Sequence, residues 1–364
     1  MPHYPQQDPI KLAEGILQLL DEGGFVATYK YALMIALLDL CIEQKQKSGL
    51  EAQSFTTLQI AKKIVEIYWP QTKEFKQQPL RQNTKGQAVV LTRIIDAQRS
   101  LGKTTSLYKF KIENQKAYNK LVKAVEREYI INPIPRLQKV GKQRLNILYE
   151  IGWDENQKIS KDDFDNTIRL YAGVADNLVI LNNLIRPLLY RHWAKMVADI
   201  NKLEDSRLEK FLFGFDRINT RNLLEGLREL QGGLCFYTGK KLTGGHEDID
   251  HFIPWARYPD NGLANLVLAD ASVNRQKRDF LAGTQHLEKW LMRLSTTSEQ
   301  TTIMHQIARD TKWPFELIKT YNVANSIYTK LPDHALLWQH GKNDFEKFEK
   351  PKIEHLFLTI NLSQ

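Results

Sequence analysis

Three fragments in the second half of the chain combine residue types that suit the hydrolysis of a phosphodiester. Asp250 and His251 are neighbours, and two asparagines, Asn265 and Asn274, follow at short intervals. An imidazole has a pKa near neutrality, so His251 can take a proton from an attacking water. The reaction also needs a hard cation held by oxygen ligands, and the Asp250 carboxylate is such a ligand. These residue types predict a general base beside a metal site.

The elements around the first two fragments must place both side chains of the Asp-His pair in one site. Adjacent side chains on a strand point to opposite faces, so Asp250 and His251 can share a site only where the backbone twists, bulges or turns. Pro254 favours a strand end there. The apolar run 266–269 predicts a second strand, which Asn265 opens. From that position the Asn265 amide would accept a hydrogen bond from the imidazole or hold the loop across it.

The third fragment supplies a further oxygen ligand and candidate phosphate contacts. Asn274 lies near the start of a polar segment that predicts a helix, where its side-chain oxygen can complete the coordination of a metal held by Asp250. A carboxylate, an amide and waters suit Mg²⁺ or Mn²⁺. Lys277 and Arg257 are the candidate phosphate contacts, although cations on a helix face or in a loop are more often only solvated. Asp248 is expected to be a surface residue.

The order and approximate spacing of these fragments carry a resemblance to a known family, through the motifs Asp250-His251-x-x-Pro254, Asn265 and Asn274-x-x-Lys277. They resemble the HNH, or ββα-metal, endonucleases. The resemblance implies that His251 activates water and that Asn265 orients the His251 side chain. It also implies that Asp250 and Asn274 hold one divalent metal. Each fragment alone is commonly an ordinary polar pair at a strand end, and only their order and closeness favour a nuclease site.

Two departures from the family pattern bear on the metal content. The last motif position is often histidine, and the asparagine here is closer to the Asp-His-Asn variant in the HNH domain of RNA-guided CRISPR nucleases, which favours Mg²⁺ or Mn²⁺ over zinc. Many members also carry a Cys-x-x-Cys pair where this chain has Cys235 and Thr238, and the later pair is missing. No structural Cys₄ zinc is therefore expected. The segment that contains Cys235 and Thr238 is expected to form a hairpin that is held by packing.

Composition and charge limit the classes of protein to which this chain can belong. The chain has 364 residues, enough for two or three domains. No stretch is apolar enough for a membrane span, and the start lacks the plan of a signal peptide, so we expect a cytoplasmic protein with no membrane partner. Of the net charge of +9, the whole excess falls between Arg81 and Arg144, with fifteen Lys and Arg against four acids. Such a segment favours contact with a polyanion, and the alternative is a solvated helical face.

We expect an α+β fold that is mainly α-helical, with an N-terminal helical region, a ββα-metal (HNH) nuclease module and a helical C-terminal tail. The expected parts are a helical, basic DNA-recognition region at 1–135, a connecting α/β segment at 136–205, the HNH nuclease domain at 206–295 and a C-terminal helical region at 296–364. In the connecting segment, 146–151 and 166–170 predict paired strands. A helix is predicted at 176–198, which Pro187 would kink or divide.

These features together predict a metal-dependent HNH endonuclease that cuts DNA, which we expect to be double-stranded. A recognition region joined to an HNH cutter resembles bacterial restriction and phage-defence nucleases. One HNH site acts on one strand, so double-strand breakage would need a homodimer, a defence-complex partner or two successive nicks. Two alternatives remain open: a non-catalytic nucleic-acid-binding component of a larger complex, and an RNA-cleaving nuclease.

Overall fold

The computed structural model describes residues 8–44, 53–100, 106–154, 164–204, 206–214 and 220–362. Helices predominate in these ranges, and the paired strands form small antiparallel sheets, which confirms the expected α+β, mainly α-helical fold class. No helix in the same ranges is long and apolar enough to span a bilayer. The first residues, on which the expected lack of a signal peptide rests, and the domain boundary expected at 205 lie outside them.

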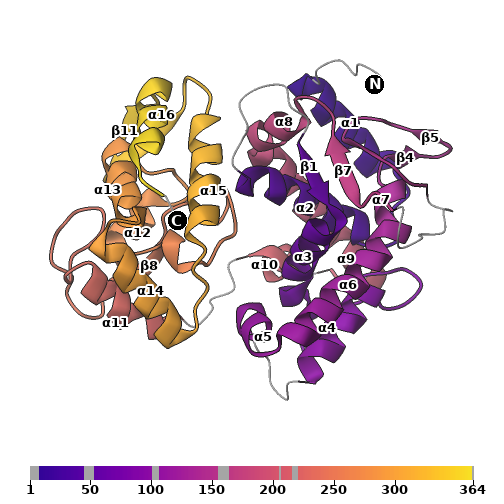
Figure 1. Cartoon of the computed structure of the whole chain (residues 1–364), viewed down its shortest axis with the longest axis horizontal. Coiled ribbons are helices and arrows are strands. Elements are labelled where there is room, and N and C mark those ends of the chain that lie inside the picture. Colours follow the sequence, from indigo (N-terminus) through magenta and orange to yellow (C-terminus); the bar gives the residue numbers. More distant parts are fainter. Residues whose placement is uncertain are drawn as a thin grey trace. The chain divides into compact units, whose positions relative to one another are not determined.

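The chain divides into two compact units, whose helices and strands are drawn in Figure 1. Unit 1 comprises Met1–Cys41 and Gln46–Gly214, and unit 2 comprises Ile42–Lys45 and Phe215–Gln364. Apart from Ile42–Lys45, the expected recognition and connecting segments therefore fall in unit 1, and nearly all of the expected nuclease and C-terminal segments fall in unit 2.

The chain up to residue 214 is built mostly from helices. They are α1 Pro9–Glu22, α2 Tyr29–Glu43, α3 Thr57–Tyr68, the 3₁₀ helix η1 Trp69–Thr72, α4 Val89–Arg99, α5 Leu107–Glu113, α6 Gln115–Ile131, α7 Pro133–Arg136, α8 Val174–Ile180, α9 Asn182–Asn201 and α10 Leu208–Phe213. The strands are β1 Ser54–Thr56, β2 Glu74–Phe75, β3 Gln78–Pro79, β4 Lys139–Val140, β5 Gln143–Arg144, β6 Tyr149–Ile151 and β7 Thr167–Leu170.

Helix α3 shows how local sequence determines structure in unit 1. Thr56 and Gln59 form a capping box, in which each side chain accepts a hydrogen bond from the backbone N–H of the other. Ile60, Ile64 and Tyr68 recur at helical spacing and are fully buried. This buried face packs against α6. The opposite face of α6 is left to solvent.

Two expectations for the connecting segment need adjustment. The predicted strand pair exists as β6 and β7, but a third strand, β1, pairs with the other edge of β7. Three residues are too few to show the alternation that identifies a strand. The predicted long helix is divided at Leu181, between α8 and α9, and Pro187 lies inside α9 instead of dividing it.

Unit 2 contains the three fragments discussed above. Its elements are α11 Arg221–Leu230, β8 Glu247–His251, the 3₁₀ helix η2 Leu263–Asn265, β9 Leu266–Asp270, α12 Ala271–Lys277, α13 Thr284–Leu294, α14 Glu299–Thr311, α15 Leu317–Thr329, β10 Leu336–His340, β11 Asp344–Lys347 and α16 Lys350–Thr359. The β10–β11 hairpin shows that the expected helical tail also contains strands. Trp290 of α13 stacks on Phe252 at a centroid distance of 4.6 Å, in the core behind β8 and β9.

Candidate active site

Two strands and a helix at 247–277 bring the three sequence fragments together. β8 and β9 pair antiparallel, and His251, the last residue of β8, lies opposite Leu266. The expected strand end at the Asp-His pair is therefore present. α12 starts directly after β9 because the Asp270 carboxylate accepts hydrogen bonds from two backbone N–H groups of its first turn. The result is a ββα arrangement, as the resemblance implied.

Asp250 uses one carboxylate oxygen for contacts within the protein. Its Oδ2 accepts a hydrogen bond from the Tyr237 hydroxyl at 2.6 Å and lies 3.0 Å from Nζ of Lys277. Its Oδ1 has no hydrogen-bond partner among the described residues. Burial and the Asp250 charge raise the pKa of Tyr237 well above its ordinary value, so the hydroxyl remains a donor. One carboxylate oxygen is thus fixed and the other is left for a different ligand.

Lys277 is the counter-ion of Asp250, whereas the sequence left a phosphate contact and a solvated helix face as the two possibilities. Its side chain is fully buried, and Nζ also donates to the carbonyl oxygen of His251 at 3.0 Å. The ammonium lies 5.7 Å from the centre of the Tyr237 ring. A lysine buried in this way is enclosed by protein groups, so the structure gives it a role within the site rather than at its surface.

His251 is held as a neutral imidazole. Its Nε2 lies 2.8 Å from Oδ1 of Asn261, and its ring centre lies 5.5 Å from that of Trp255. Burial lowers the pKa of His251 below its ordinary value of 6.5, and the nearby Lys277 charge acts in the same direction. The Asn261 hydrogen bond and the charge of Asp250 oppose this shift without overcoming it. At neutral pH the ring is therefore available to accept a proton.

Asn265 holds the loop that follows the Asp-His pair. Its Oδ1 accepts a hydrogen bond from the Ile253 N–H at 2.8 Å, and its Nδ2 donates to the carbonyl oxygens of Ile253 at 3.1 Å and Asp260 at 3.0 Å. Of the two possibilities left by the sequence, a bond to the imidazole or a hold on the loop, the contacts match the second. Asn261, which contacts His251, was not anticipated because a loop asparagine has no periodic signal.

Asn274, in the middle of α12, lies beside Asp248 of β8. The Asn274 Nδ2 donates to Asp248 Oδ2 at 3.4 Å, which leaves the amide oxygen of Asn274 without a partner among the described residues. Asp248 is two residues before Asp250 and therefore points to the same face of β8. This period of two could have placed Asp248 at the site from sequence, where we expected only a surface residue.

The oxygen atoms gathered here fit a hard cation. Oδ1 of Asp250 and the side-chain oxygen of Asn274 are both available, and Asp248 adds a second carboxylate beside Asn274. Mg²⁺ is usually held by one or two carboxylates and keeps several waters. No three of His, Cys, Asp and Glu are grouped for metal binding among the described residues, so the site would rely on an amide oxygen and water as well. Asp250 and Asn274 would hold the ion.

Arg257, the second expected phosphate contact, lies in the loop between β8 and η2. It is partly buried, and burial lowers its pKa, while the neighbouring Asp279 charge acts in the opposite direction. A guanidinium remains charged after such a shift. Its contact with phosphate remains a prediction.

Hydrogen bonds hold the hairpin that contains Cys235 and Phe236, before β8, in place. The Phe236 N–H donates to the Leu268 carbonyl at 2.9 Å, and the Asp270 N–H donates to Sγ of Cys235 at 3.4 Å. Lys289 of α13 donates to the Phe236 carbonyl at 2.6 Å. Together with the Tyr237 bond to Asp250, these contacts fix the segment around Cys235 and Thr238.

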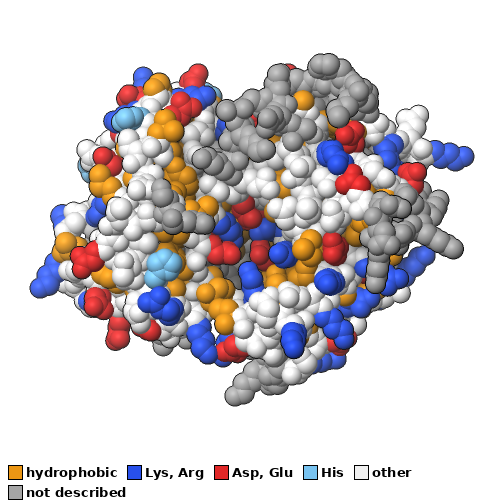
Figure 2. Space-filling view, viewed as in Figure 1, with side chains coloured by type: hydrophobic (Ala, Val, Ile, Leu, Met, Phe, Trp, Pro, Cys, Tyr) orange, Lys and Arg blue, Asp and Glu red, His pale blue; other side chains and the backbone are white. Residues whose placement is uncertain are grey.

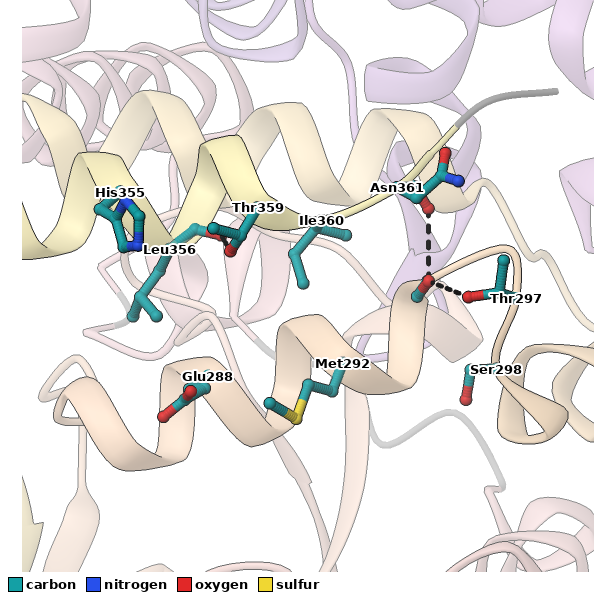
Figure 3. Close-up of a pocket in the computed structure, with 10 residues that line it drawn as sticks. Glu288, Met292, Thr297, Ser298, His355, Leu356, Thr359, Ile360 and Asn361 are labelled. Atoms are coloured by element: carbon teal, nitrogen blue, oxygen red, sulfur yellow. Dashed lines mark hydrogen bonds between the residues drawn. The ribbon is translucent and has the colours of Figure 1, made fainter.

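A pocket of about 600 Å³ lies elsewhere in unit 2, between α13 and the end of α16 (Figure 3). Met292 of α13 and Leu356 and Ile360 at the other wall supply its apolar lining. Ser295 closes one end through hydrogen bonds to Thr297 and to the Asn361 carbonyl. None of the candidate catalytic or metal-binding residues lines this pocket, so it is separate from the ββα site.

Comparison with known proteins matches residues 235–282 to the HNH endonuclease family. The matched segment contains the hairpin, β8, β9 and α12, and thus every residue of the ββα site described above. No curated protein and no solved structure matches the chain. HNH endonucleases are metal-dependent enzymes that act on nucleic acid. Residues 235–282 are therefore an HNH endonuclease domain, and the protein that carries them is a nuclease that hydrolyses phosphodiester bonds.

Proposed function

We propose that this nuclease cuts DNA, with His251 as the general base and with Mg²⁺ or Mn²⁺ held by Asp250 and Asn274. The observation that carries the proposal is the imidazole of His251 at a strand end, hydrogen-bonded through Nε2 to Asn261 and one residue from a carboxylate whose Oδ1 has no partner among the described residues. A base and a hard-cation ligand on adjacent residues are what metal-assisted hydrolysis requires.

The hydrogen bond to Asn261 supports a specific role for each nitrogen of His251. An amide oxygen can only accept a hydrogen bond, so Nε2 carries the proton and Nδ1 keeps its lone pair. Nδ1 is then the atom that takes the proton from the attacking water. Asn265 contributes by fixing the loop backbone next to Asn261. A bound cation would polarise the phosphate and stabilise the leaving oxygen.

Nicking of supercoiled plasmid tests this function directly. Cleavage should require Mg²⁺ or Mn²⁺, and the His251→Ala variant should lose it while its melting temperature and its binding of DNA stay close to those of the wild type. His305→Ala, an exposed histidine of the same unit, is the control and should cut normally. Wild-type turnover by His251→Ala would refute the assignment of the base. Cleavage of single-stranded RNA but not of DNA would favour the RNA-cleaving alternative.

A row of cations on α6 supports double-stranded DNA as the partner of unit 1. Lys116, Lys120, Lys123 and Arg127 are all exposed and recur at intervals of four, three and four residues, so they share one face of the helix. We call these four residues the α6 row. At 1.5 Å per residue it extends over roughly 16 Å. Figure 2 shows Lys and Arg side chains gathered over the part of unit 1 formed by α4, α5 and α6.

Charge pairing in the same helix favours this reading over a simply solvated face. The two acids of α6 are used elsewhere: Glu128 pairs with Arg93 at 3.1 Å, and Glu126 accepts a hydrogen bond from Thr57 at 2.6 Å. No carboxylate of the described residues pairs with the α6 row. Unpaired cations along one face can neutralise successive phosphates and release their counterions.

The biological setting that we propose is restriction or anti-phage defence, in the cytoplasm. It rests on the combination of a basic region with an HNH domain in one chain. A single HNH site cuts one strand, so this role would require a homodimer, a partner nuclease or two successive nicks.

A further inference from the structure

We propose that Tyr237 and Lys277 restrict Asp250 to ligation through one oxygen, and that this restriction makes the site select Mg²⁺ or Mn²⁺ over Ca²⁺. The proposal rests on the proposed function, because it takes Asp250 as a ligand of the metal. It adds two positioning residues that do not touch the metal, and it assigns them a role in metal specificity.

The first support is the unequal use of the two carboxylate oxygens. Tyr237 and Lys277 both direct a donor at Oδ2, at 2.6 and 3.0 Å, and no described residue bonds Oδ1. Hydrogen bonds to an ionised oxygen are the stronger kind, so Oδ2 would have to lose two of them to bind a cation. Oδ1 loses none. The carboxylate is thus prepared to offer one oxygen.

The second support is that both donors are rigidly held by different elements. Lys277, at the end of α12, is fully buried, and its Nζ is also bound to the His251 carbonyl at 3.0 Å. Tyr237 is anchored through its ring, which packs edge-on against Trp338 at a centroid distance of 5.3 Å. Neither side chain can swing away without opening the core. The restriction on Oδ2 is therefore part of the fold.

The third support is electrostatic. A cation that bound both oxygens of Asp250 would have to approach Oδ2, which lies 3.0 Å from the ammonium of Lys277. Two like charges at a few ångströms repel appreciably, even at the effective dielectric of a protein surface. Binding through Oδ1 alone places the cation on the far side of the carboxylate. The charge of Lys277 thus penalises two-oxygen binding more than one-oxygen binding.

Metal chemistry converts this restriction into selectivity. Mg²⁺ requires near-octahedral geometry at 2.0–2.1 Å and is usually bound by one oxygen from each carboxylate together with waters. Ca²⁺ takes 6–8 oxygen ligands at 2.3–2.6 Å and often uses a carboxylate through both oxygens. A site in which Asp250 cannot offer Oδ2 supplies Ca²⁺ with too few oxygen ligands. Ca²⁺ should therefore bind more weakly than Mn²⁺, and it should compete poorly.

The experiment measures Mn²⁺ affinity by electron paramagnetic resonance, and Ca²⁺ affinity by its competition with Mn²⁺, for the full chain without DNA. Tyr237→Phe removes one hydroxyl and should weaken Mn²⁺ binding by about 10- to 100-fold, which is the usual cost of losing a hydrogen bond to a metal ligand. The ratio of the Ca²⁺ and Mn²⁺ dissociation constants should fall towards one. Thermal unfolding of the same samples shows that the variant is folded.

Tyr328→Phe is the matched control, because Tyr328 is also a buried tyrosine of unit 2 whose hydroxyl makes a hydrogen bond, at 2.8 Å to the Ala282 carbonyl. Loss of the Tyr328 hydroxyl should change the thermal stability of the protein but not its affinity or selectivity for Mn²⁺. Asp250→Ala should abolish the Mn²⁺ binding for which Ca²⁺ competes. Its loss would identify the measured site as the one that contains Asp250.

Three outcomes separate this proposal from the proposed function. Saturable Mn²⁺ binding that Tyr237→Phe leaves within twofold of wild type would overturn the role of Tyr237 while the metal site stands. Equal affinity of the wild-type protein for Ca²⁺ and Mn²⁺ would overturn the selectivity without any substitution. Mn²⁺ binding that persists in Asp250→Ala would instead contradict the metal site of the proposed function, and this inference with it.

Discussion

Neutralising the α6 row should change how the binding of DNA depends on salt. The variant replaces the four cations by glutamine, which keeps the side chains polar and the helix propensity high. It is made in the His251→Ala background so that bound DNA is not cut. The substitutions are Lys116→Gln, Lys120→Gln, Lys123→Gln and Arg127→Gln, all at exposed positions of α6.

The size of the effect follows from the number of phosphates that the α6 row can neutralise. Each contact with duplex DNA contributes about 0.9 to the slope of log K against log salt concentration. If all four cations contact phosphate, the slope should become shallower by about 3.6. Relative to a 1 M reference, this amounts to roughly a 10³-fold loss of affinity at 0.15 M salt. One or two contacts would give a proportionally smaller change.

The assay is fluorescence anisotropy with a labelled duplex, titrated at several salt concentrations. A matched control removes four other exposed cations of unit 1 that lie outside α6, namely Lys11, Lys142, Arg191 and Lys195. The control has the same change in net charge, so a general loss of attraction would appear equally in both proteins. Only a direct contact predicts a larger change of slope for the α6 row.

An unchanged slope in the α6 variant, or a change no larger than that of the control, would contradict this prediction. Either outcome would mean that the α6 row is a solvated face and that DNA is held elsewhere. The nuclease function would not be affected, because the ββα site lies in unit 2.

Two further predictions concern the ββα site. The rate of nicking should rise with pH through a midpoint below 6.5, because burial lowers the pKa of His251 and only its neutral form accepts a proton; a single-turnover pH profile with its midpoint above 6.5 would contradict this. Asn265→Ala should lower the free energy of unfolding of unit 2 by several kcal/mol in urea titrations, since each buried group left without a partner costs about 1–3 kcal/mol. Asn274→Ala, which loses only a contact with Asp248, should unfold close to wild type, and equal effects of the two variants would contradict the role of Asn265.

Much of the ββα site could be predicted from sequence because its chemistry limits the residue types. The site needs a proton acceptor and an oxygen ligand close together, and Pro254 favours a strand end beside them. The order of β8, β9 and α12 therefore followed from the spacing of Asp250, Asn265 and Asn274. The strand and helix periods that support this order are local properties of the chain.

The remainder depends on contacts between residues that are distant in sequence. Lys277 looked like a surface cation because its burial comes from packing against Tyr237 and the strand, which no local pattern reveals. Asn261 lies ten residues beyond His251 in a loop without periodicity, and only the fold of that loop places it on the imidazole. The position of the break between α8 and α9 likewise followed tertiary packing and not the proline.

The hairpin that is closed by the chain's own hydrogen bonds has a consequence for how the enzyme depends on its surroundings. Where zinc closes this hairpin, one chelator or one shortage of zinc disturbs both folding and catalysis. Here hydrogen bonds of Phe236, Cys235 and Tyr237 tie the same hairpin to β9 and β8. With these contacts in place, removal of the divalent ion proposed for Asp250 and Asn274 is expected to stop the cleavage of phosphodiester bonds without unfolding the hairpin.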